Sequence, residues 1–349
     1  MIARELKLRP NKKQEITFNE WLWNLTGVYN WAIRKIELDA KDNIYHTRLD
    51  FANLLSDHGK KIDIPSHTIQ GTLVQAWLAW NRCFKKIAKK PKLKSNRRKF
   101  SSIPFPDPIK NIQNNYIGLP GLKSVRFHKQ ELPEGKIKCG RIVRRADGWF
   151  LCLMIDAVHE FVIKDTEKSV GIDPGFTNLL TLSDGIKFEN PRELRKRELR
   201  LAQAQRGNDK KLVARLSLAT ARIKKDRNHK ISRKLIEDYR TIYYSDDNFK
   251  GMSRKFGKSV SEAALGQLIG MITYKGLTGG RNIIPVNSKF TTMTCSSCGR
   301  LSGPTGLNGL AVRFWECECG SNHDRDINAA MVIFKTGAGI ALEREVRHA

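Results

Sequence analysis

The 349-residue sequence has few acidic residues, no long apolar run, no internal repeat and no low-complexity linker. Its 63 lysines and arginines outnumber 35 aspartates and glutamates, which leaves a net charge of +28 at pH 7. The apolar runs fall far short of the ~20 residues that a membrane helix needs, and the charged start MIARELKLRPNKK is unlike a secretory signal. We therefore expect no membrane partner and a cytoplasmic protein that binds a polyanion.

Acids are missing altogether from residues 81–100, which carry ten lysines or arginines. A run of one charge is often only a solvated helix face, but the lack of acidic partners favours contact with phosphates. Residues 191–235 are similarly basic, with 16 lysines or arginines against four acids. The residues predicted to bind nucleic acid are Lys85, Lys86, Lys89, Lys90, Lys92, Lys94, Arg97, Arg98, Lys99, Arg222, Lys224 and Lys225.

The spacing of apolar residues predicts an α+β protein of several domains. Residues 12–90 have helical periodicity, with Pro65 and Ser66 marking the start of a second helix. Short alternating segments over 100–156, with Asp147-Gly148 as a hairpin signal, predict a small antiparallel barrel or sheet. Strands and helices then alternate from residue 168, which predicts an α/β sheet. Four aromatic residues of the first helix are expected in its core rather than as stacking surfaces for bases: Trp21, Trp23, Tyr29 and Trp31.

Four of the seven cysteines lie within one stretch of 25 residues, while Cys83, Cys139 and Cys152 are scattered. In a reducing compartment such clustering favours a metal site over disulfides. The second pair, CEC, is one residue tighter than the usual CxxC, and His323 is a substitute ligand if Cys317 cannot turn inward. A tetrahedral set filled by protein leaves no position for a substrate, so we predict a structural zinc site. Its ligands are Cys295, Cys298, Cys317 and Cys319.

Two aspartates lie where catalytic carboxylates could be held. Asp173 ends the strand KSVGID before Pro-Gly, and Asp326 begins the helix of DRDINAA. Taken alone, the first is a turn residue and the second an acid favoured by the helix dipole. A catalytic role for the two aspartates is indicated only if the fold brings them close together.

The motifs GIDPGFTNLLTLSDG, YYSDDNFKGM, YKGLTGGRNIIPVNSKFTTMTCSSCGR and WECECGSNHDRDINAA follow one another along the chain. With KKPKLKSNRRKFSSIPF and the strand segments between 119 and 156, they resemble the TnpB family of transposon-encoded proteins, compact relatives of type V CRISPR effectors. The resemblance spans most of the chain. It implies an RNase H-like (RuvC) domain with an inserted zinc ribbon, a β-barrel wedge domain and a helical recognition domain. The implied bounds are 1–10 and 100–160 for the wedge, 11–99 for the helical domain, 161–290 and 322–349 for RuvC, and 291–321 for the ribbon.

The resemblance also implies an activity and its partners. Family members are RNA-guided DNA endonucleases, in which a guide RNA from the transposon end pairs with target DNA beside a short adjacent motif. The implied partners are guide RNA, double-stranded target DNA and the RNA–DNA heteroduplex, bound by a protein that is a monomer with RNA and associates with the prokaryotic nucleoid. The implied cofactors are two Mg²⁺ or Mn²⁺ ions at the RuvC site and a structural Zn²⁺.

The carboxylate triad of the family is incomplete here. Its first and last aspartates match Asp173 and Asp326, but the middle glutamate matches Ser245, whose neutral hydroxyl is a poor ligand for hard cations. We expect Glu262, at the start of the helix SEAALGQLIGMI, to replace it from the flank of the buried face. In the alternative, Ser259-Val-Ser-Glu262 is only a capping box. Asp247 is a weaker candidate, because in an extended strand it lies about 6–7 Å beyond Ser245 at ~3.3 Å per residue. Asp246 is weaker too, because it would point to the opposite face of that strand.

These residues leave three functions open. The primary prediction is a metal-dependent nuclease that uses Asp173, Asp326 and a relocated Glu262. The main alternative is a nuclease-inactive RNA-guided DNA-binding protein that acts as a transcriptional repressor, which Ser245 favours. A third is a transposition accessory protein that binds DNA without a guide.

Overall fold

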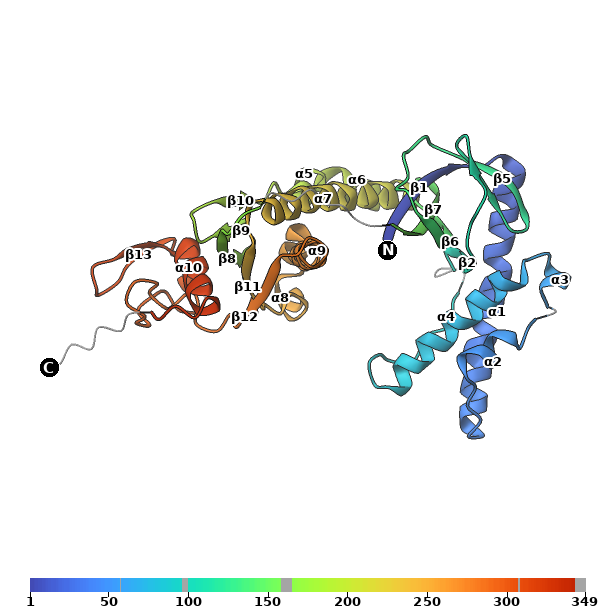
Figure 1. The fold of residues 1–349 in the computed structure, drawn as a ribbon, viewed down its shortest axis with the longest axis horizontal. Helices are drawn as coiled ribbons and strands as arrows, with labels where there is room; N and C mark the ends of the chain where they lie inside the picture. Colours follow the sequence, from blue (N-terminus) through green and yellow to red (C-terminus); the bar gives the residue numbers. More distant parts are fainter. Residues whose placement is uncertain (57, 96–99, 158–164, 307, 343–349) are drawn as a thin grey trace. The chain divides into compact units, whose positions relative to one another are not determined.

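The structure is a computed structural model that describes residues 1–349 except 57, 96–99, 158–164, 307 and 343–349. The chain divides into two compact units, Met1–His159 and Glu160–Ala349 (Figure 1). Both units combine helices with strands, so the predicted mixed α+β class is confirmed. Within the described ranges, no helix combines the length and apolar character needed to cross a bilayer.

The first unit is built on a seven-stranded antiparallel sheet with the order β2-β6-β7-β1-β5-β4-β3. Its longest ladder joins β6 to β7, and the pairing of Arg145 with Gly148 confirms the predicted hairpin. Gly148 adopts a φ of +130° there, a conformation that favours glycine. The strands are β1 (Ile2–Arg9), β2 (Ser102–Phe105), β3 (Ile112–Gln113), β4 (Tyr116–Leu119), β5 (Leu122–Phe127), β6 (Lys136–Arg145) and β7 (Gly148–Asp156).

Four helices complete the first unit. They are α1 (Lys12–Lys41), α2 (Arg48–Asn53), α3 (His58–Ile62) and α4 (Ser66–Phe84). Asn11 and Gln14 form a capping box at the start of α1, and α4 begins at the predicted Ser66. Helical structure ends at Phe84, six residues before the predicted limit at 90.

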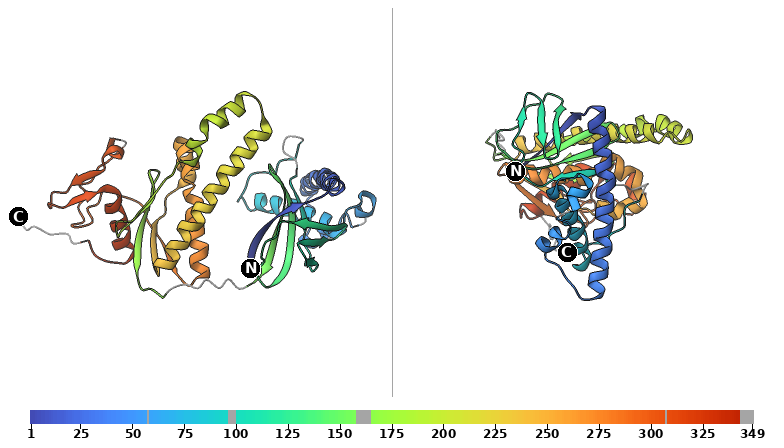
Figure 2. Two further views of the ribbon diagram at one scale, coloured as in Figure 1. Left: turned by 90° about the horizontal axis from the view of Figure 1, so that it is seen from above. Right: turned by 90° about the vertical axis from the view of Figure 1, so that its right-hand side faces the viewer.

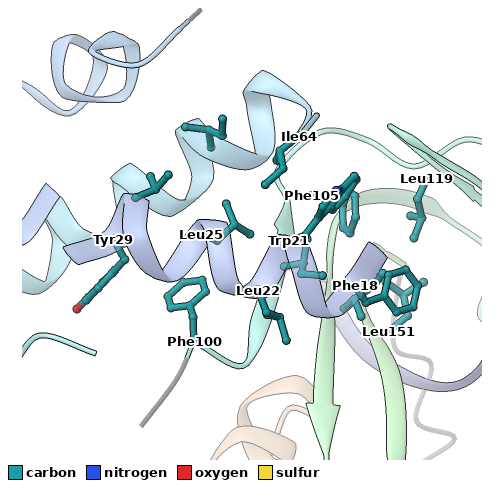
Figure 3. Packing of buried hydrophobic residues seen from close by; sticks show 14 of the residues in the cluster. Phe18, Trp21, Leu22, Leu25, Tyr29, Ile64, Phe100, Phe105, Leu119 and Leu151 are labelled. Atoms are coloured by element: carbon teal, nitrogen blue, oxygen red, sulfur yellow. The ribbon is translucent and has the colours of Figure 1, made fainter. Parts of the chain in front are cut away.

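One hydrophobic cluster joins these helices to the sheet. Figure 3 shows Phe18 beside Leu151 and Trp21 beside Phe105, whose ring centroid lies 6.5 Å from that of Trp21. The segments expected to form a helical domain and a barrel domain therefore share a core. Burial of Trp21 and Tyr29 confirms their predicted core positions, whereas Trp23 is 61% exposed and Trp31 is 38% exposed. For those two residues the core prediction was wrong.

The second unit contains a five-stranded sheet with the order β10-β9-β8-β11-β12. Strands β8, β9 and β10 are antiparallel, whereas β11 runs parallel to both β8 and β12. The strands are β8 (Ser169–Pro174), β9 (Asn178–Leu182), β10 (Lys187–Glu189), β11 (Thr241–Ser245) and β12 (Asn282–Val286). A separate ribbon pairs β13 (Phe314–Glu316) with β14 (Asn322–Asp324).

Helices cover both faces of this sheet. Helix α10 packs on one face and α7 and α9 on the other, as Figure 1 and the left view of Figure 2 show. Helix α10 comes so close to β8 that a Cβ on Gly171 would lie 2.2 Å from the carbonyl oxygen of Ala330. The helices are α5 (Glu193–Lys196), α6 (Glu198–Arg206), α7 (Lys210–Asp238), α8 (Phe249–Ala263), α9 (Leu265–Thr278) and α10 (Arg325–Gly337).

The helix predicted to start near Ser259 is interrupted. Helix α8 begins after its N-cap Asn248 and ends at Ala263, and Ala264 adopts a left-handed φ of 52° before α9 starts. The chain also kinks at Phe256, three residues before Ser259, but the alternative of a capping box is wrong, because Glu262 Oε1 accepts the Leu194 N–H and its Oε2 has no partner among the described residues. Glu262 consequently occupies the last turn of α8.

Candidate functional site

Two parallel strands bring the first candidate residues to one edge of the sheet. The register pairs Tyr244 of β11 with Ile172 of β8, and the next residues along the two strands are Ser245 and Asp173. Asp326 joins them from the first turn of α10, the helix that packs on β8. Neighbouring parallel strands end at the same edge, so local sequence order becomes spatial proximity here.

These residues line a cavity of about 450 Å³. Asp173, Ser245, Asp247 and Asp326 all contribute to its wall, and Glu262 does not. The carboxylates are close enough to influence one another. Burial is the main cause that raises the pKa of Asp173 well above its ordinary value, followed by the negative charges of Asp326 and Asp247, while Arg325 opposes the rise. The cavity thus concentrates negative charge that a divalent cation would relieve.

Ser245 and Asp247 act together at the end of β11. The Ser245 hydroxyl donates a hydrogen bond of 2.6 Å to Oδ2 of Asp247, and Ser245 is buried. Asp246 does not line the cavity, and its Oδ1 accepts the N–H of Ser288 at 3.1 Å. Asp247 comes closer to Ser245 than an extended strand would allow, because the strand ends at Ser245.

Two arginines also belong to this cavity, and the sequence interpretation missed both. Arg313, just before β13 of the ribbon, lies 3.5 Å from Oδ2 of Asp326, and Arg325 lies 3.9 Å from its Oδ1. Arg325 directly precedes Asp326, which was an available signal. Nothing in the sequence indicated that Arg313 approaches from the ribbon. The two guanidinium groups balance part of the acidic charge of the cavity.

Glu262 occupies a different environment. It is buried, and its Oε1 accepts the N–H of Leu194 at the start of α5 over 2.8 Å. Lys224 donates to the neighbouring Ser261 carbonyl at 2.7 Å, and Arg227 pairs with Glu193 at 3.2 Å. The expected approach of Glu262 to Asp173 and Asp326 is not what the geometry favours, because the break at Ala264 leaves Glu262 among α5, α7 and α8. Its Oε1 fastens α5 to α8, while its Oε2 is buried without a hydrogen-bond partner among the described residues.

The four clustered cysteines come together as predicted. Their sulfur atoms all lie within 4.8 Å of one another, and no other group of three or more His, Cys, Asp or Glu ligands meets that limit in the described part of the chain. Each pair forms a tight turn closed by a glycine of positive φ, Gly299 at 73° and Gly320 at 84°. His323 also approaches, with Nε2 3.0 Å from the sulfur of Cys295. Four thiols in this arrangement can hold a structural metal ion.

The basic residues differ in what they contact. Lys85, Lys86, Lys89, Lys90 and Lys92 are exposed, as are Arg222 and Lys225. Lys94 lies with its Nζ 5.4 Å from the ring centroid of Tyr29. Lys224 is engaged with Ser261, which favours a structural role over a phosphate contact. The remaining predicted residues, Arg97, Arg98 and Lys99, lie outside the described residues.

Comparison with known proteins finds two family models on the second unit. A model described as "Probable transposase" (OrfB_IS605) matches residues 162–255, and the Cas12f1-like TNB domain matches residues 266–333. A Streptomyces pristinaespiralis protein named "Putative RNA-guided DNA endonuclease" is 31% identical over 295 residues, which cover 79% of this chain and 72% of that protein.

Two further similarities extend along most of the chain. "Putative RNA-guided DNA endonuclease InsQ" of Escherichia coli (strain K12) is 23% identical, with 97% of this chain and 92% of that protein covered. A solved Cas12f1-sgRNA-target DNA complex is 19% identical, with 96% of this chain and 99% of that chain covered, at a TM-score of 0.38.

Proposed function

Because this chain belongs to the TnpB family, we propose that it is a transposon-encoded, RNA-guided DNA endonuclease. It binds a guide RNA from the transposon end and cleaves matched DNA next to a short adjacent motif. Its large positive charge supports this proposal, because a guide–target heteroduplex is held mainly through its phosphates. The exposed lysines between Phe84 and Lys92 are the clearest surface for such contacts.

The observation that carries the proposal is the acidic cavity at the strand ends of the second unit. Three antiparallel strands followed by two parallel ones, with acids at the ends of β8 and β11, support an RNase H-like (RuvC) domain. The raised pKa of Asp173 supports divalent cation binding, because burial and two neighbouring carboxylates disfavour its ionised form when no cation is present. Oxygen donors of this kind suit Mg²⁺ or Mn²⁺.

We assign Asp173, Asp326 and Asp247 as the residues that hold the metal ions. Two such ions, when bound, activate a water molecule and stabilise the leaving oxygen of a phosphodiester. Asp247 supplies the third carboxylate that Ser245 lacks, and the Ser245 hydroxyl orients it through their hydrogen bond. Arg313 and Arg325 hold Asp326 in the cavity and offer cationic groups toward a phosphate. Glu262 keeps a positioning role, as the acceptor for the first turn of α5.

The cysteine cluster holds a structural Zn²⁺ in this proposal. Its four sulfurs leave no position for a water or substrate, so the ion contributes to folding rather than to the reaction. Hydrogen bonds join the segment that carries the first two cysteines to α10, the helix that carries Asp326. Asn328 of α10 donates to the Thr294 carbonyl at 2.7 Å and accepts the Ser296 N–H at 2.8 Å.

Ser245 favours a second candidate function, an RNA-guided DNA-binding protein that represses transcription without cleavage. A buried hydroxyl at this position removes one carboxylate from the cavity. If Asp247 does not replace it, the metal shell is too weak for hydrolysis while guided binding persists.

One experiment separates the two functions. The protein is co-expressed with the RNA of its transposon end, and a guide-matched supercoiled plasmid is incubated with the purified complex in Mg²⁺, Mn²⁺ or EDTA. The nuclease predicts metal-dependent cleavage that Asp173→Asn abolishes without loss of plasmid binding. Guided binding with no cleavage in either metal would identify the repressor, and absence of a specific co-purified RNA would remove both guided functions.

A further inference from the structure

A group of cationic side chains lies on the outer face of the first unit's sheet, where β1 pairs with β5. Burial alternates along β1, with Leu6 and Leu8 in the core. Lys7 and Arg9 therefore point to the opposite, exposed face. The register places Arg126 of β5 directly opposite Arg9, so the two guanidinium groups stand on the same face. The function proposed above gives these residues no role of their own.

His128 completes the group just beyond the end of β5. Its N–H donates to the Lys7 carbonyl at 2.9 Å, which continues the antiparallel pairing by one residue pair. Its ring meets Arg9, whose Nε donates to Nε2 of His128 at 3.0 Å. Lys7 and His128 thus form one row, and Arg9 and Arg126 form a second row about 7 Å along the strands, at ~3.4 Å per residue. We call these four residues the basic quartet.

The protein compensates little of the charge of the basic quartet. Burial lowers the pKa of His128, and the positive charges of the other three members lower it further. In the part of the chain that the structure describes, Lys7 is the one member with an ion pair, to Asp147 at 3.9 Å. Glu5, the next residue of β1 on this face, is already paired with Arg145 of β6. Two arginines directly opposite one another destabilise a sheet, so the arrangement costs stability in the free protein.

The surroundings of the basic quartet suit a phosphate-bearing ligand. Two adjacent guanidinium groups present planar forks that bind phosphate oxygens bidentately. Helix α1 begins three residues after Arg9, and its first turn adds the positive end of the helix dipole and the exposed Lys12 and Lys13. Tyr116 of β4 stands opposite Arg126 in the register and is 44% exposed, which places an aromatic ring beside the arginines.

We propose that the basic quartet binds two consecutive phosphates of a nucleic-acid strand, one on each row, with a base or sugar of that strand against Tyr116. The aromatic ring favours nucleic acid over polyanions that have no bases. Guide RNA and target DNA both carry this chemistry, and the test distinguishes them. The inference rests on the proposed nucleic-acid binding and adds a second contact surface in the first unit, far in sequence from the exposed lysines between Phe84 and Lys92.

The test measures how salt weakens binding of the full chain to fluorescein-labelled single-stranded RNA, single-stranded DNA and duplex DNA. Each phosphate contact contributes about 0.7 to the slope of log affinity against log salt on a single strand, and about 0.9 on duplex DNA. Arg126→Gln should lower the slope by that amount, and the double variant with Arg9→Gln by about twice as much, with about tenfold or more loss of affinity at low salt. Lys138→Gln is the matched control. It removes an exposed charge of the same sheet that is paired with Asp156, and should leave the slope unchanged.

Two further measurements separate binding from folding and charge from stacking. Arg126→Gln relieves the repulsion between facing arginines, so its melting temperature should stay or rise at low salt. Tyr116→Ala changes no charge, so it should lower affinity and leave the salt slope as in the wild type.

An unchanged slope in the double arginine variant, or a change equal to that of Lys138→Gln, would overturn the proposal. A lower melting temperature with a wild-type slope would do the same, since the arginines would then be structural. A slope change confined to RNA identifies the guide as the ligand, and one confined to DNA identifies the target. Guided plasmid cleavage is measured separately. A chain that cleaves its plasmid while the slope stays unchanged would lose this site alone, whereas a chain that binds no strand at all would lose the proposed function as well.

Discussion

The second unit contains two candidate metal sites that are assembled in opposite ways. The cysteine cluster takes its four sulfurs from two short turns of one ribbon and brings them within 4.8 Å of one another. The acidic cavity takes Asp173, Asp247 and Asp326 from two strand ends and a helix, and these carboxylates do not converge within that limit. Local turns preassemble the first site, whereas the second depends on the register of β8 and β11 and on the packing of α10 on β8.

The difference has an electrostatic cause. Burial first, and then the charges of Asp326 and Asp247, raise the pKa of Asp173, while two arginines beside Asp326 and the Ser245 hydroxyl bonded to Asp247 offset part of the acidic charge. A structural site gains by keeping its ligands together, because metal binding then contributes directly to folding.

The largest effect should come from breaking the cysteine cluster. Cys298→Ser should remove bound zinc and open residues 288–325 to protease, because structural zinc can contribute about 10 kcal/mol or more to folding. Metal analysis and limited proteolysis measure both effects. Cys83→Ser, a change at a free cysteine outside the cluster, is the matched control and should alter neither. Full zinc content in Cys298→Ser would show that the cluster is not the ligand set.

The same variant also links the two sites. The ribbon is tied to α10 through Asn328 and through Lys335, whose Nζ donates to the Ser296 carbonyl at 2.8 Å. Loss of zinc should therefore displace the helix that carries Asp326 and reduce cleavage as well. Cleavage at the wild-type rate by zinc-free protein would show that the sites are independent.

A matched pair of neighbours tests the composition of the acidic cavity. Asp247→Asn should lower cleavage by more than about 100-fold, beyond the loss typical of an outer-shell partner, because it removes a carboxylate from the cavity. Asp246→Asn should have little effect on cleavage, since Asp246 does not line the cavity and asparagine keeps an oxygen that accepts the Ser288 N–H. Glu262→Gln keeps an acceptor for Leu194 and should retain cleavage. If cleavage were lost only in Glu262→Gln, the prediction that Glu262 replaces the missing catalytic glutamate would be supported instead.

What the sequence could predict follows the same division between local and long-range order. The cysteine pairs, the strand before Asp173 and the hairpin at Gly148 depend on a few adjacent residues, and their signals were sufficient. Glu262 was misplaced because the helix was assumed continuous through Ala264, and alanine gives no warning of a left-handed φ of 52°. Side-chain contacts that cross between elements had no comparable signal.

Asp247 and Trp23 illustrate that limit. Asp247 was ranked low because β11 was extended past Ser245, whereas the chain turns there and permits the 2.6 Å hydrogen bond between the two side chains. Trp23 is a residue type that usually lies in a core, but it lies on a side of α1 that α4 and the sheet do not cover. Which face a long helix buries is decided by its partners.

Ser245→Glu adds a fourth carboxylate to the acidic cavity and so tests whether a metal ion binds there. Without metal the variant should be less stable than the wild type, because another negative charge joins Asp173 and Asp247. With Mg²⁺ at about a hundred times its dissociation constant, binding should return about 2.7 kcal/mol, a rise of several degrees in melting temperature. Ser245→Gln has the same size without the charge and keeps only the three aspartates of the cavity, so its Mg²⁺-dependent rise should be smaller. Identical rises in the two variants would mean that residue 245 does not contact the bound ion.

The smallest effect concerns a buried charge that the chain satisfies without metal or substrate. Lys275 of α9 donates to the His229 carbonyl and to Ser232 Oγ, both at 2.7 Å, and burial lowers its pKa to about 8. The unfolded chain keeps this proton up to about pH 10.4, so between the two values it binds more protons and the free energy of unfolding rises with pH. Relative to Lys275→Met, the wild type should gain on the order of 1–3 kcal/mol between pH 8 and 10 in urea unfolding. Lys230→Met, at an exposed lysine of α7, should run parallel to the wild type. If the difference in the free energy of unfolding between wild type and Lys275→Met stayed constant from pH 8 to 10, the pKa of Lys275 would not be lowered by burial. The cost of buried charge in this unit would then be confined to the carboxylates that face one another.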